Sequence, residues 1–371
     1  MSSPDARPQS SLAALTGARF FAALWVLVYH RAGAFLEGGP RLIAELRASG
    51  YAAVSFFFVL SGFVLAWRHA DDLPLDRRRF RASRIARIAP LYVLAWALTT
   101  PFVFARAHHS LALTAAAGGV HLVALQSWIP GGALSWNVPA WSVSCEVFFY
   151  ALFPTLLEAL RRRRWSSRSL HAAIAIVLLA GVALPRLLVF AFLSRGSWSA
   201  PWMDLVLYSP LARLPEFVLG ILLAERFLLE KRAASETDDG GAMTFAALAL
   251  LAALFASSSD LEGAMPLLHT ALAAPLFALL VLGLARGGGI LGRALAQPTL
   301  VTLGAGSYAL YILQQPILDA LLSLRGEPLV APPPSLALLV EYLALMIAVS
   351  LAAERFVAEP LRRSLATRLS R

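Results

Sequence analysis

The stretch ARFFAALWVLVYH, residues Ala18 to His30, carries an arginine at its start and a histidine at its end around an otherwise apolar run. With its flanks it extends over residues 12–35, and about 20 apolar residues are enough to cross the hydrocarbon core of a membrane. Ionisable side chains inside such a span are costly and usually mark a function. The stretch therefore predicts a membrane span that carries functional residues.

Apolar runs of the same kind recur along the whole chain. Of its 371 residues, 58% are hydrophobic, which is more than an ordinary soluble domain carries. We therefore expect an all-α fold, a polytopic transmembrane helical bundle of about ten spans with one re-entrant or interfacial segment. The expected spans cover residues 12–35, 50–68, 88–107, 143–160, 169–193, 205–229, 243–258, 266–285, 298–322 and 336–356.

Arginine clusters at residues 77–87, 161–168 and 362–371 indicate the topology of this bundle. Short loops rich in arginine stay on the cytoplasmic side of a membrane, and the three clusters share that side only if residues 110–142 do not cross. We therefore expect residues 110–142 to form the re-entrant or interfacial segment, facing the exterior. Both termini are then cytoplasmic, and the chain is a multi-pass protein of the cell (inner) membrane.

One membrane domain is expected to occupy residues 12–358. A short cytoplasmic N-terminus, 1–11, precedes it, a basic cytoplasmic tail, 359–371, follows it, and a polar cytoplasmic linker, 230–241, lies within it. The formal net charge of +10 comes from arginines that gather between apolar runs, which is a topology signal and not a nucleic-acid surface. Membrane lipids are therefore expected as partners, and nucleic acid is not.

Arg19 and His30 are eleven residues apart, which at about 100° per residue returns to nearly the same face of a helix, roughly 16 Å along its axis. Both side chains can therefore line one groove. The alternative is that Arg19 extends to the cytoplasmic headgroups while His30 ends the helix near the opposite interface. Neutral histidine can take a proton from an alcohol, so His30 is the candidate general base.

Two further stretches place polar side chains in apolar surroundings. SYALYILQQPI puts Ser307, Tyr311 and Gln314 on one face of an expected span, where they either bind a substrate or hydrogen-bond between helices. PAWSVSCEVFFYALFP puts Glu146 at the start of another span, where it either caps the first turn or orients and charge-pairs His30.

Arg84 and Arg87 lie one helical turn apart at the cytoplasmic end of the third expected span. Such arginines anchor a protein to anionic lipid, and paired guanidinium groups also bind phosphate oxygens bidentately. The histidines show no metal-ligand spacing with acidic partners, so no metal is expected.

These stretches together resemble the membrane-bound acyltransferase 3 family, from about residue 12 to residue 363. The family's first-span pattern of arginine, ten residues and histidine is Arg19 to His30 here. The other matching motifs, in family order, are SFFFVLSGFVLAW, RIARIAPLY, WSVSCEVFFY with its glutamate, RLPEFVLG, SYALYILQQP and FVAEPLRR. The C-terminal SGNH-type hydrolase domain of some members is not expected here.

The resemblance implies an O-acyltransferase (EC 2.3.1.-) with acyl-CoA, acetyl-CoA by default, as the donor from the cytoplasm. The acceptor would be a hydroxyl of a carbohydrate, a lipid-linked glycan or a secondary metabolite. Family members usually carry histidine where this chain has Gln314, and glutamine cannot shuttle a proton. The predicted catalytic residues are His30 and Glu146; Arg19, Arg84 and Arg87 bind the donor phosphates; Ser307, Tyr311, Gln314 and Trp141 bind the acceptor.

Alternatives to this reading remain open from the sequence. His30 either activates the acceptor directly or carries the acyl group in a covalent relay. Among other classes of protein, a proton- or ion-coupled transporter could use the same His, Glu and Arg side chains as an ion path. A membrane scaffold would keep its function without His30. The sequence gives no oligomeric state.

Overall fold

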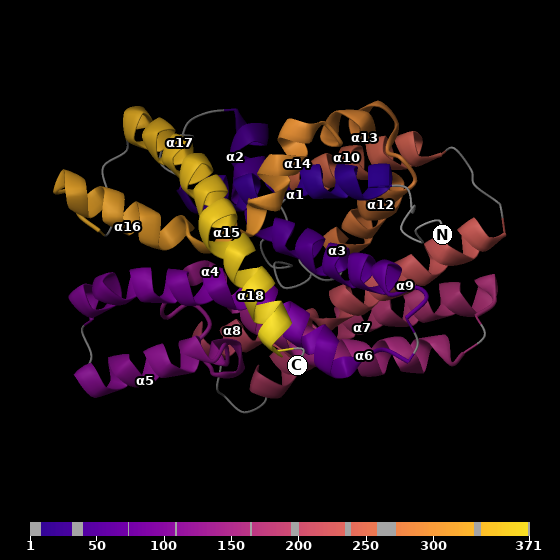
Figure 1. The fold of residues 1–371 in the computed structure, drawn as a ribbon, viewed down its shortest axis with the longest axis horizontal. Helices are drawn as coiled ribbons and strands as arrows, with labels where there is room; N and C mark the ends of the chain where they lie inside the picture. The colour runs from indigo at the N-terminus through magenta and orange to yellow at the C-terminus, as the bar shows by residue number, and fades with distance from the viewer. Residues whose placement is uncertain are drawn as a thin grey trace. The chain divides into compact units, whose positions relative to one another are not determined.

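The computed structural model describes residues 9–31, 40–72, 74–107, 110–163, 165–193, 200–233, 239–257, 272–329 and 335–369. Throughout these ranges the regular structure is helical and no strand occurs, which confirms the all-α expectation (Figure 1). Several predicted stretches lie outside the described residues. They are 1–8 of the N-terminus, 32–35, 258 and 266–271 of three spans, 234–238 of the linker and 370–371 of the tail.

The chain divides into two compact units. Unit 1 comprises Met1–Ala70, Ser167–Leu178 and Glu216–Ser307, and unit 2 comprises Asp71–Ser166, Leu179–Pro215 and Tyr308–Arg371. Unit 1 holds α1 (Gln9–Arg31), α2 (Arg41–Ala48), η2 (Gly50–Ala52), α3 (Ala53–Arg68), α10 (Gly240–Ala256), α12 (Ala274–Ala285), α13 (Gly289–Leu295) and α14 (Pro298–Ala305). Unit 2 holds α4 (Arg77–Arg106), α5 (Leu111–Leu122), η3 (Gln126–Trp128), η4 (Val138–Ala140), α6 (Trp141–Arg161), α8 (Ala200–Tyr208), α15 (Ser307–Ile312), α16 (Gln314–Arg325), α17 (Leu336–Ala353), η7 (Glu354–Ala358) and α18 (Glu359–Leu369). Unit boundaries fall inside α7 (Ser167–Leu193), α9 (Pro210–Arg232) and α15, whose first residue, Ser307, belongs to unit 1.

Seven helical stretches among the described residues are long and apolar enough to cross a membrane, and the bent pair α12–α13 makes an eighth if it counts as one span. Large apolar side chains stand exposed on them, such as Phe190 at 71% and Leu187 at 62%. Contact with lipid accounts for this exposure, because hydrocarbon does not penalise apolar surface as water does. The seven are Leu12–His30, Arg41–Arg68, Arg77–Arg106, Val138–Arg161, Ser167–Ala191, Trp202–Arg232 and Leu336–Leu369.

Three of the ten predicted spans differ from the structure. The span predicted at 243–258 is α10, which has 17 residues and is short for a crossing. The described part of the span predicted at 266–285 is α12, which bends by 80° into α13. The span predicted at 298–322 is broken into α14, α15 and α16. The count of about ten spans is therefore not confirmed.

The break between α15 and α16 falls at Leu313, and Pro316 explains it. Proline has no backbone N–H, so Pro316 cannot donate the helical bond to the carbonyl four residues earlier, that of Ile312. The side chain of Asn137 donates to this carbonyl instead, with Nδ2 3.0 Å from the oxygen. A side chain from another segment thus satisfies the helix end.

In unit 1, α1 packs tightly against α13 and α14. A Cβ atom at Gly17 would lie 2.0 Å from the carbonyl oxygen of Leu295, and one at Gly304 would lie 1.9 Å from that of Thr16. Only glycine permits such close backbones, and small residues commonly mark helix contacts in membranes. These contacts fix the helix that carries Arg19 and His30.

A second glycine contact joins α3 and α9. A Cβ atom at Gly62 would lie 2.1 Å from the carbonyl oxygen of Phe217, and one at Gly220 would lie 2.0 Å from that of Val59. Both glycines belong to stretches matched in the sequence, SFFFVLSGFVLAW and RLPEFVLG. These two motifs therefore include a structural feature, the close crossing of two helices.

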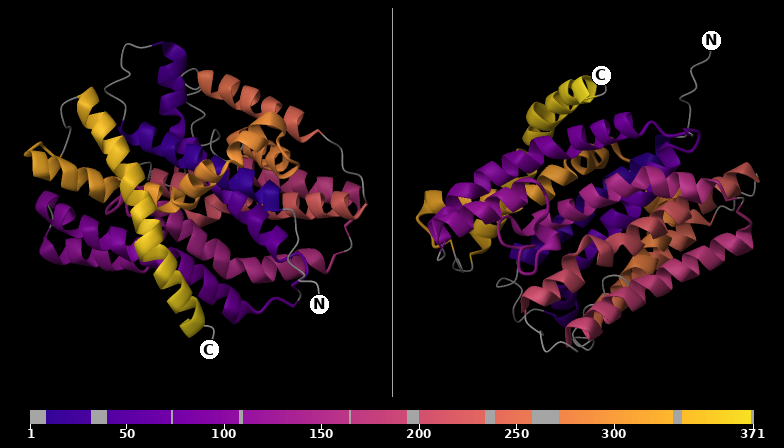
Figure 2. Two further views of the ribbon diagram at one scale, coloured as in Figure 1. Left: turned by 45° about the horizontal axis from the view of Figure 1, so that its top comes forward. Right: turned by 90° about the horizontal axis from the view of Figure 1, so that it is seen from below.

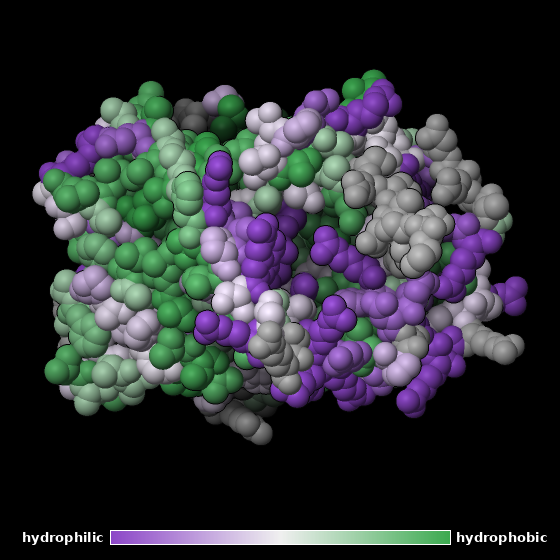
Figure 3. All heavy atoms as spheres, viewed as in Figure 1, coloured by the Kyte–Doolittle hydropathy of each residue, from purple (hydrophilic) through white to green (hydrophobic). Residues whose placement is uncertain are grey.

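In unit 2, α4 begins at an N-cap, because the Asp76 carboxylate accepts from the Arg79 N–H at 2.9 Å. α4 packs on α6 through the stacked rings of Phe80 and Phe153, whose centroids are 5.0 Å apart. α17 continues through a π-helical turn into α18, which contacts α4, and the two form one long helix in Figures 1 and 2. Figure 3 shows mostly hydrophobic side chains over α5 and α17, and hydrophilic ones over α18.

Residues 110–142 contain the short helix α5. Ser110 caps it by accepting from the Leu113 N–H, and its 12 residues span about 18 Å. This is well short of the roughly 30 Å of hydrocarbon in a bilayer. The length of α5 agrees with the prediction that this region does not cross.

Candidate active site

The predicted site residues fall in both units. Unit 1 holds Arg19, His30 and Ser307. Each unit is described by itself, so the pairing of His30 with Glu146 stays a prediction. Unit 2 holds Arg84, Arg87, Trp141, Glu146, Tyr311 and Gln314.

His30 lies in the last turn of α1, and Arg19 lies on the same continuous helix. Both side chains are half-buried. The imidazole of His30 meets the ring of Tyr29 edge to face, with 4.8 Å between centroids. Tyr29 in turn contacts Tyr51, 5.5 Å away between centroids. An aromatic wall thus lies beside the candidate base.

Glu146 lies on α6 in unit 2 and is half-buried. Its carboxylate acts electrostatically on the phenols of Tyr308 and Tyr311, both on α15. Tyr308 also lies within the electrostatic range of the Arg87 guanidinium, and its hydroxyl donates to the Ile88 carbonyl at 3.3 Å. The hydrogen bond of Tyr308 thus joins α15 to α4, the helix that carries Arg84 and Arg87.

Arg84 belongs to the same region of α4. Its guanidinium carbon lies 5.8 Å from the ring centroid of Phe80 and 5.9 Å from that of Tyr150, which is on α6 one turn beyond Glu146. Cation–π contacts of this kind orient a guanidinium while leaving its edge able to donate. Arg84 and Arg87 are both half-buried.

Trp141 is the first residue of α6 and is 7% exposed. Glu146 follows five residues later, so it does not cap the first turn, and that alternative for Glu146 is wrong. The guanidinium carbon of Arg213 lies 5.6 Å from the Trp141 ring centroid. Arg213 is itself 1% exposed and acts electrostatically on Tyr311. Trp141 is therefore part of a buried wall and not an open surface.

Tyr311 and Gln314 are tied into the helix break. The Tyr311 hydroxyl donates to the Pro139 carbonyl at 3.0 Å, and the Gln314 amide nitrogen donates to the Tyr311 carbonyl at 2.8 Å. The Tyr342 hydroxyl donates to the backbone carbonyl of Gln314 at 2.7 Å. The predicted single face of Ser307, Tyr311 and Gln314 is wrong in one respect, because the helix is interrupted at Leu313 before Gln314.

Two oxygens of this predicted stripe are buried without a hydrogen-bond partner. They are Oγ of Ser307 and Oε1 of Gln314, and each residue is 1% exposed. A buried polar atom without a partner is costly, and such atoms commonly serve a ligand.

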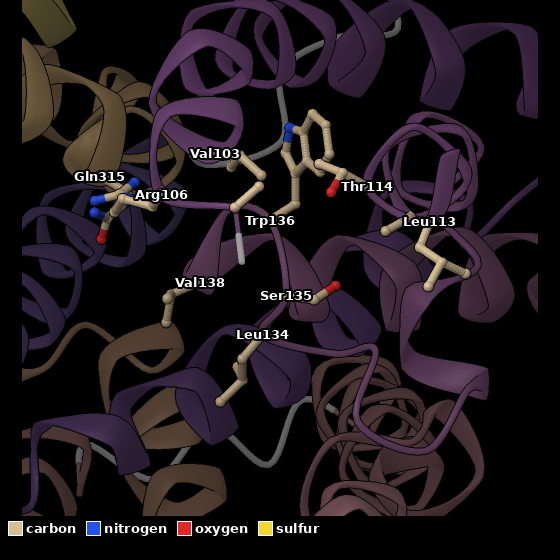
Figure 4. A pocket seen from close by; sticks show the side chains of 11 residues that line it. Val103, Arg106, Leu113, Thr114, Leu134, Ser135, Trp136, Val138 and Gln315 are labelled. Atoms are coloured by element: carbon tan, nitrogen blue, oxygen red, sulfur yellow. The ribbon is translucent and has the colours of Figure 1, made fainter. Parts of the chain in front are cut away.

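The structure also contains a cavity of about 540 Å³ (Figure 4). It lies in unit 2 where α4 ends, beside α5 and α16, and Arg106 and Gln315 line it together with Trp136. Arg106 forms a bidentate ion pair with Asp319, with nitrogen–oxygen distances of 3.0 and 2.7 Å. The only sequence signal was Asp319 itself, a carboxylate inside a predicted span.

His121, in the last turn of α5, is a further buried polar residue of unit 2. It is 1% exposed, and its Nε2 lies 3.2 Å from the Gly132 carbonyl and 3.0 Å from the Ser135 hydroxyl. The Tyr92 hydroxyl donates to its backbone carbonyl. His121 therefore holds residues 126–140 against α4. Among the described residues, no group of three His, Cys, Asp or Glu side chains is arranged to hold a metal ion.

Comparison with known proteins gives the family. The family model described as an acyltransferase domain matches residues 12–355. Acyltransferase MdmB of Streptomyces mycarofaciens is 34% identical over 233 residues, which are 57% of this chain and 57% of MdmB. Protein 2 in the picA locus of Rhizobium radiobacter is 30% identical over 190 residues, 46% of this chain and 91% of that protein.

Exopolysaccharide production protein ExoZ of Rhizobium meliloti (strain 1021) is 33% identical over 110 residues, 28% of this chain and 33% of ExoZ. The match to MdmB thus spans little more than half of that protein. No solved structure matches the chain. Because the family model covers most of its length, the chain belongs to the acyltransferase 3 family.

Proposed function

We propose that the protein is an integral membrane O-acyltransferase that moves an acyl group, acetyl as the first candidate, from acyl-CoA to a hydroxyl of a carbohydrate, a lipid-linked glycan or a secondary metabolite. The observation that carries the proposal is the placement of Arg19 and His30 eleven residues apart on the continuous helix α1. A carbohydrate acceptor is supported by the name of ExoZ, an exopolysaccharide production protein.

In the proposed reaction, the neutral imidazole of His30 takes the proton of the acceptor hydroxyl as its oxygen attacks the thioester carbonyl carbon. The new C–O bond forms, the C–S bond breaks, and the CoA thiolate leaves and takes up the proton from His30. Glu146 is proposed to orient the imidazole or pair with its charge. In the relay variant, the His30 imidazole first attacks the thioester carbonyl carbon, the C–S bond breaks and the CoA thiolate leaves. The acceptor oxygen then takes the acyl group from the imidazole as the acyl C–N bond breaks, and the hydroxyl proton passes to the thiolate.

Arg19, Arg84 and Arg87 are proposed to bind the phosphates of CoA, because guanidinium groups bind phosphate oxygens bidentately. The assignment is supported by the half-buried positions of Arg84 and Arg87 one turn apart on α4. It is also supported by the rings of Phe80 and Tyr150, which lie 5.8 and 5.9 Å from the Arg84 guanidinium carbon and orient it. Donor phosphates and a candidate positioning carboxylate would then belong to one region of unit 2.

Ser307, Tyr311, Gln314 and Trp141 are proposed to bind the acceptor. The buried oxygens of Ser307 and Gln314 without a protein partner support this, since an acceptor hydroxyl could donate to them. Because Gln314 cannot carry a proton, its proposed role is hydrogen bonding alone. We also propose that the protein resides in the cell (inner) membrane with both termini cytoplasmic, on the strength of the arginine clusters.

The direct test is to incubate purified protein in lipid nanodiscs with radiolabelled acetyl-CoA and a panel of glycans, methyl glycosides and hydroxylated natural products. The proposal expects label in at least one acceptor and stoichiometric release of CoA. If no acceptor is labelled and no thioester is hydrolysed in any mixture, the proposal is wrong.

The donor site is tested with Arg84→Ala and Arg87→Ala. Loss of a charge-assisted contact should raise the KM for acetyl-CoA about tenfold, corresponding to roughly 1.4 kcal/mol. Arg81→Ala is the matched control, because Arg81 is exposed on the same helix. Equal KM values in all three variants and the wild type would show that Arg84 and Arg87 do not bind the donor.

A further inference from the structure

The cavity at the end of α4 has the composition of a small-molecule site. Its volume of about 540 Å³ lies within the usual range for ligand pockets, which are mostly apolar with a few convergent polar groups. Leu113 and Val138 supply apolar walls, and Arg106, Ser135 and Gln315 supply polar ones. Figure 4 shows Arg106 and Gln315 together on one side of the cavity and Leu113 on the opposite side.

The polar side of the cavity is held rigidly. Asp319 is completely buried, and Arg106 binds it with two nitrogens while keeping 27% of its own side chain exposed. The Gln315 amide nitrogen donates to the same carboxylate at 2.9 Å. Arginine has five N–H donors, and the pair with Asp319 takes two of them. The pair with Asp319 therefore fixes the Arg106 guanidinium and leaves three of its N–H donors unused by that carboxylate.

The charge of this wall favours a neutral ligand. Asp319 neutralises Arg106, and among the described residues no other charged side chain lines the cavity. A phosphate or carboxylate would find no net positive charge, whereas hydroxyl groups can both donate to and accept from such a neutral polar set. A cavity for a lipid chain would not need a buried ion pair, whose desolvation is costly. The polar set favours a polyhydroxylated molecule over a lipid.

The aromatic wall is also fixed. The indole of Trp136 is 4% exposed and stacks on Trp96, with centroids 6.0 Å apart and planes 7° from parallel. It also donates through Nε1 to the Trp96 carbonyl at 3.4 Å. Trp136 is thus a rigid side of the cavity, and a sugar ring of defined size can fit against it.

The position of the cavity indicates the membrane face to which it opens. Arg106 is the last residue of α4, and the arginine cluster at Arg77–Arg87 opens the same helix. The 30 residues of α4 span about 45 Å, more than the roughly 30 Å of hydrocarbon. If the cluster is cytoplasmic, the cavity opens at the exterior.

We propose that this cavity is an acceptor subsite that binds a neutral hexose unit of a glycan from the exterior side. The inference rests on the proposed acyl transfer to a hydroxyl and names the acceptor class. Arg106 and Gln315 hydrogen-bond the sugar hydroxyls, and Trp136 bounds the ring. Gln315, which lines the cavity, directly follows Gln314, one of the proposed acceptor-binding residues.

Cysteine labelling tests binding without relying on catalysis. The chain has one cysteine, Cys145, and it is fully buried, so an introduced cysteine reports alone. Ser135→Cys places a thiol at an exposed position of the cavity wall. Ser323→Cys is the control, an exposed position on α16 outside the cavity. Both variants, in nanodiscs, react with a membrane-impermeant maleimide in the presence of methyl glucoside, methyl galactoside or methyl mannoside.

The expected result is that at least one glycoside slows the labelling of Ser135→Cys about tenfold when present at about nine times its dissociation constant, and leaves Ser323→Cys unchanged. No protection of Ser135→Cys by any of the three would overturn the subsite, whether the cavity binds no sugar or a lipid already fills it. The labelling assay measures sugar binding and does not require catalysis. The proposed enzymatic function is tested separately by the wild-type transfer assay.

A kinetic arm uses Ala117→Trp, which fills the cavity, and Ala116→Trp, which adds the same ring to an exposed neighbouring position on α5 outside it. With an acceptor glycan that the wild type modifies, Ala117→Trp should raise the acceptor KM at least about tenfold. Ala116→Trp should keep the wild-type value. Equal KM values in the two variants would contradict the subsite.

Discussion

Asn137 links the residues of the proposed acceptor site to the helix break beside them. Its amide satisfies the Ile312 carbonyl that Pro316 leaves without a helical donor, and Asn137 is 2% exposed. Replacing it with leucine should leave that buried carbonyl unpaired. The hydrogen bond from Asn137, in the segment before α6, therefore stabilises the backbone between Tyr311 and Gln314.

Asn137→Leu is therefore expected to lower the free energy of unfolding by about 1–3 kcal/mol. Unfolding in mixed micelles with increasing SDS measures the change. Gln297→Leu is the control, because Gln297 is exposed and makes no side-chain cap, and it should stay within about 0.5 kcal/mol of wild type. Equal stability of the two variants would show that the break does not depend on Asn137.

His121 should make stability depend on pH. Burial lowers the pKa of His121 to about 4, below the usual value near 6.5 for an unfolded chain. Between these values the unfolded state binds a proton that the folded state does not, so stability is full above about pH 6.5 and falls toward pH 4. The His121 contribution to this loss is about 3 kcal/mol at most.

His121→Gln should flatten this part of the pH profile, because glutamine does not titrate. Thermal unfolding of the two proteins at several pH values between 4.5 and 7 measures the difference. Parallel profiles for the variant and the wild type would mean that His121 does not set the acid sensitivity.

At the scale of helices, the crossing of α3 and α9 depends on glycine. A methyl group at Gly220 would lie 2.0 Å from the Val59 carbonyl, so the two helices must separate to accept it. Gly220→Ala is expected to cost about 1–3 kcal/mol in the same SDS titration. Gly119→Ala is the control, because nothing lies within 4 Å of its added Cβ, and it should be neutral or slightly stabilising. A Gly220→Ala protein as stable as Gly119→Ala would contradict the tight crossing.

The sequence predicted those helices whose apolar runs are continuous. α3, α6 and α7 all lie at or near the expected ranges, because length and hydropathy alone determine a span. The break at Leu313 was missed because the apolar pattern continues through it, and only Pro316 marked it. One proline inside an apolar run does not by itself distinguish a kink from a break.

Residues of the candidate site were predictable to different degrees. Arg19 and His30 follow from spacing on one helix, and α1 is continuous between them. The Arg106–Asp319 pair joins residues 213 positions apart, and no local pattern relates two such residues. Tertiary packing alone brings them together, so the cavity that they border could not be derived from the sequence.

At the scale of the whole molecule, the proposed donor and acceptor regions lie at different points along one helix, α4. The proposed donor-binding residues Arg84 and Arg87 lie in the first half of α4, and the proposed acceptor cavity lies where α4 ends. If the donor binds on one side of the membrane and the acceptor on the other, the thioester and the acceptor hydroxyl must come together within the membrane. His30, the proposed catalytic residue, belongs to unit 1, whereas both proposed binding regions on α4 belong to unit 2.

The most direct measurement of this account is the rate of transfer of radiolabelled acetyl groups from acetyl-CoA to acceptor by wild type and His30→Ala in nanodiscs. His69→Ala is the control, a histidine at the C-terminal cap of α3 outside the proposed site. We predict that His30→Ala transfers at least about 100-fold more slowly, as expected for loss of a general base or covalent carrier, while His69→Ala keeps the wild-type rate. A folded His30→Ala protein that transfers at the wild-type rate would contradict the account.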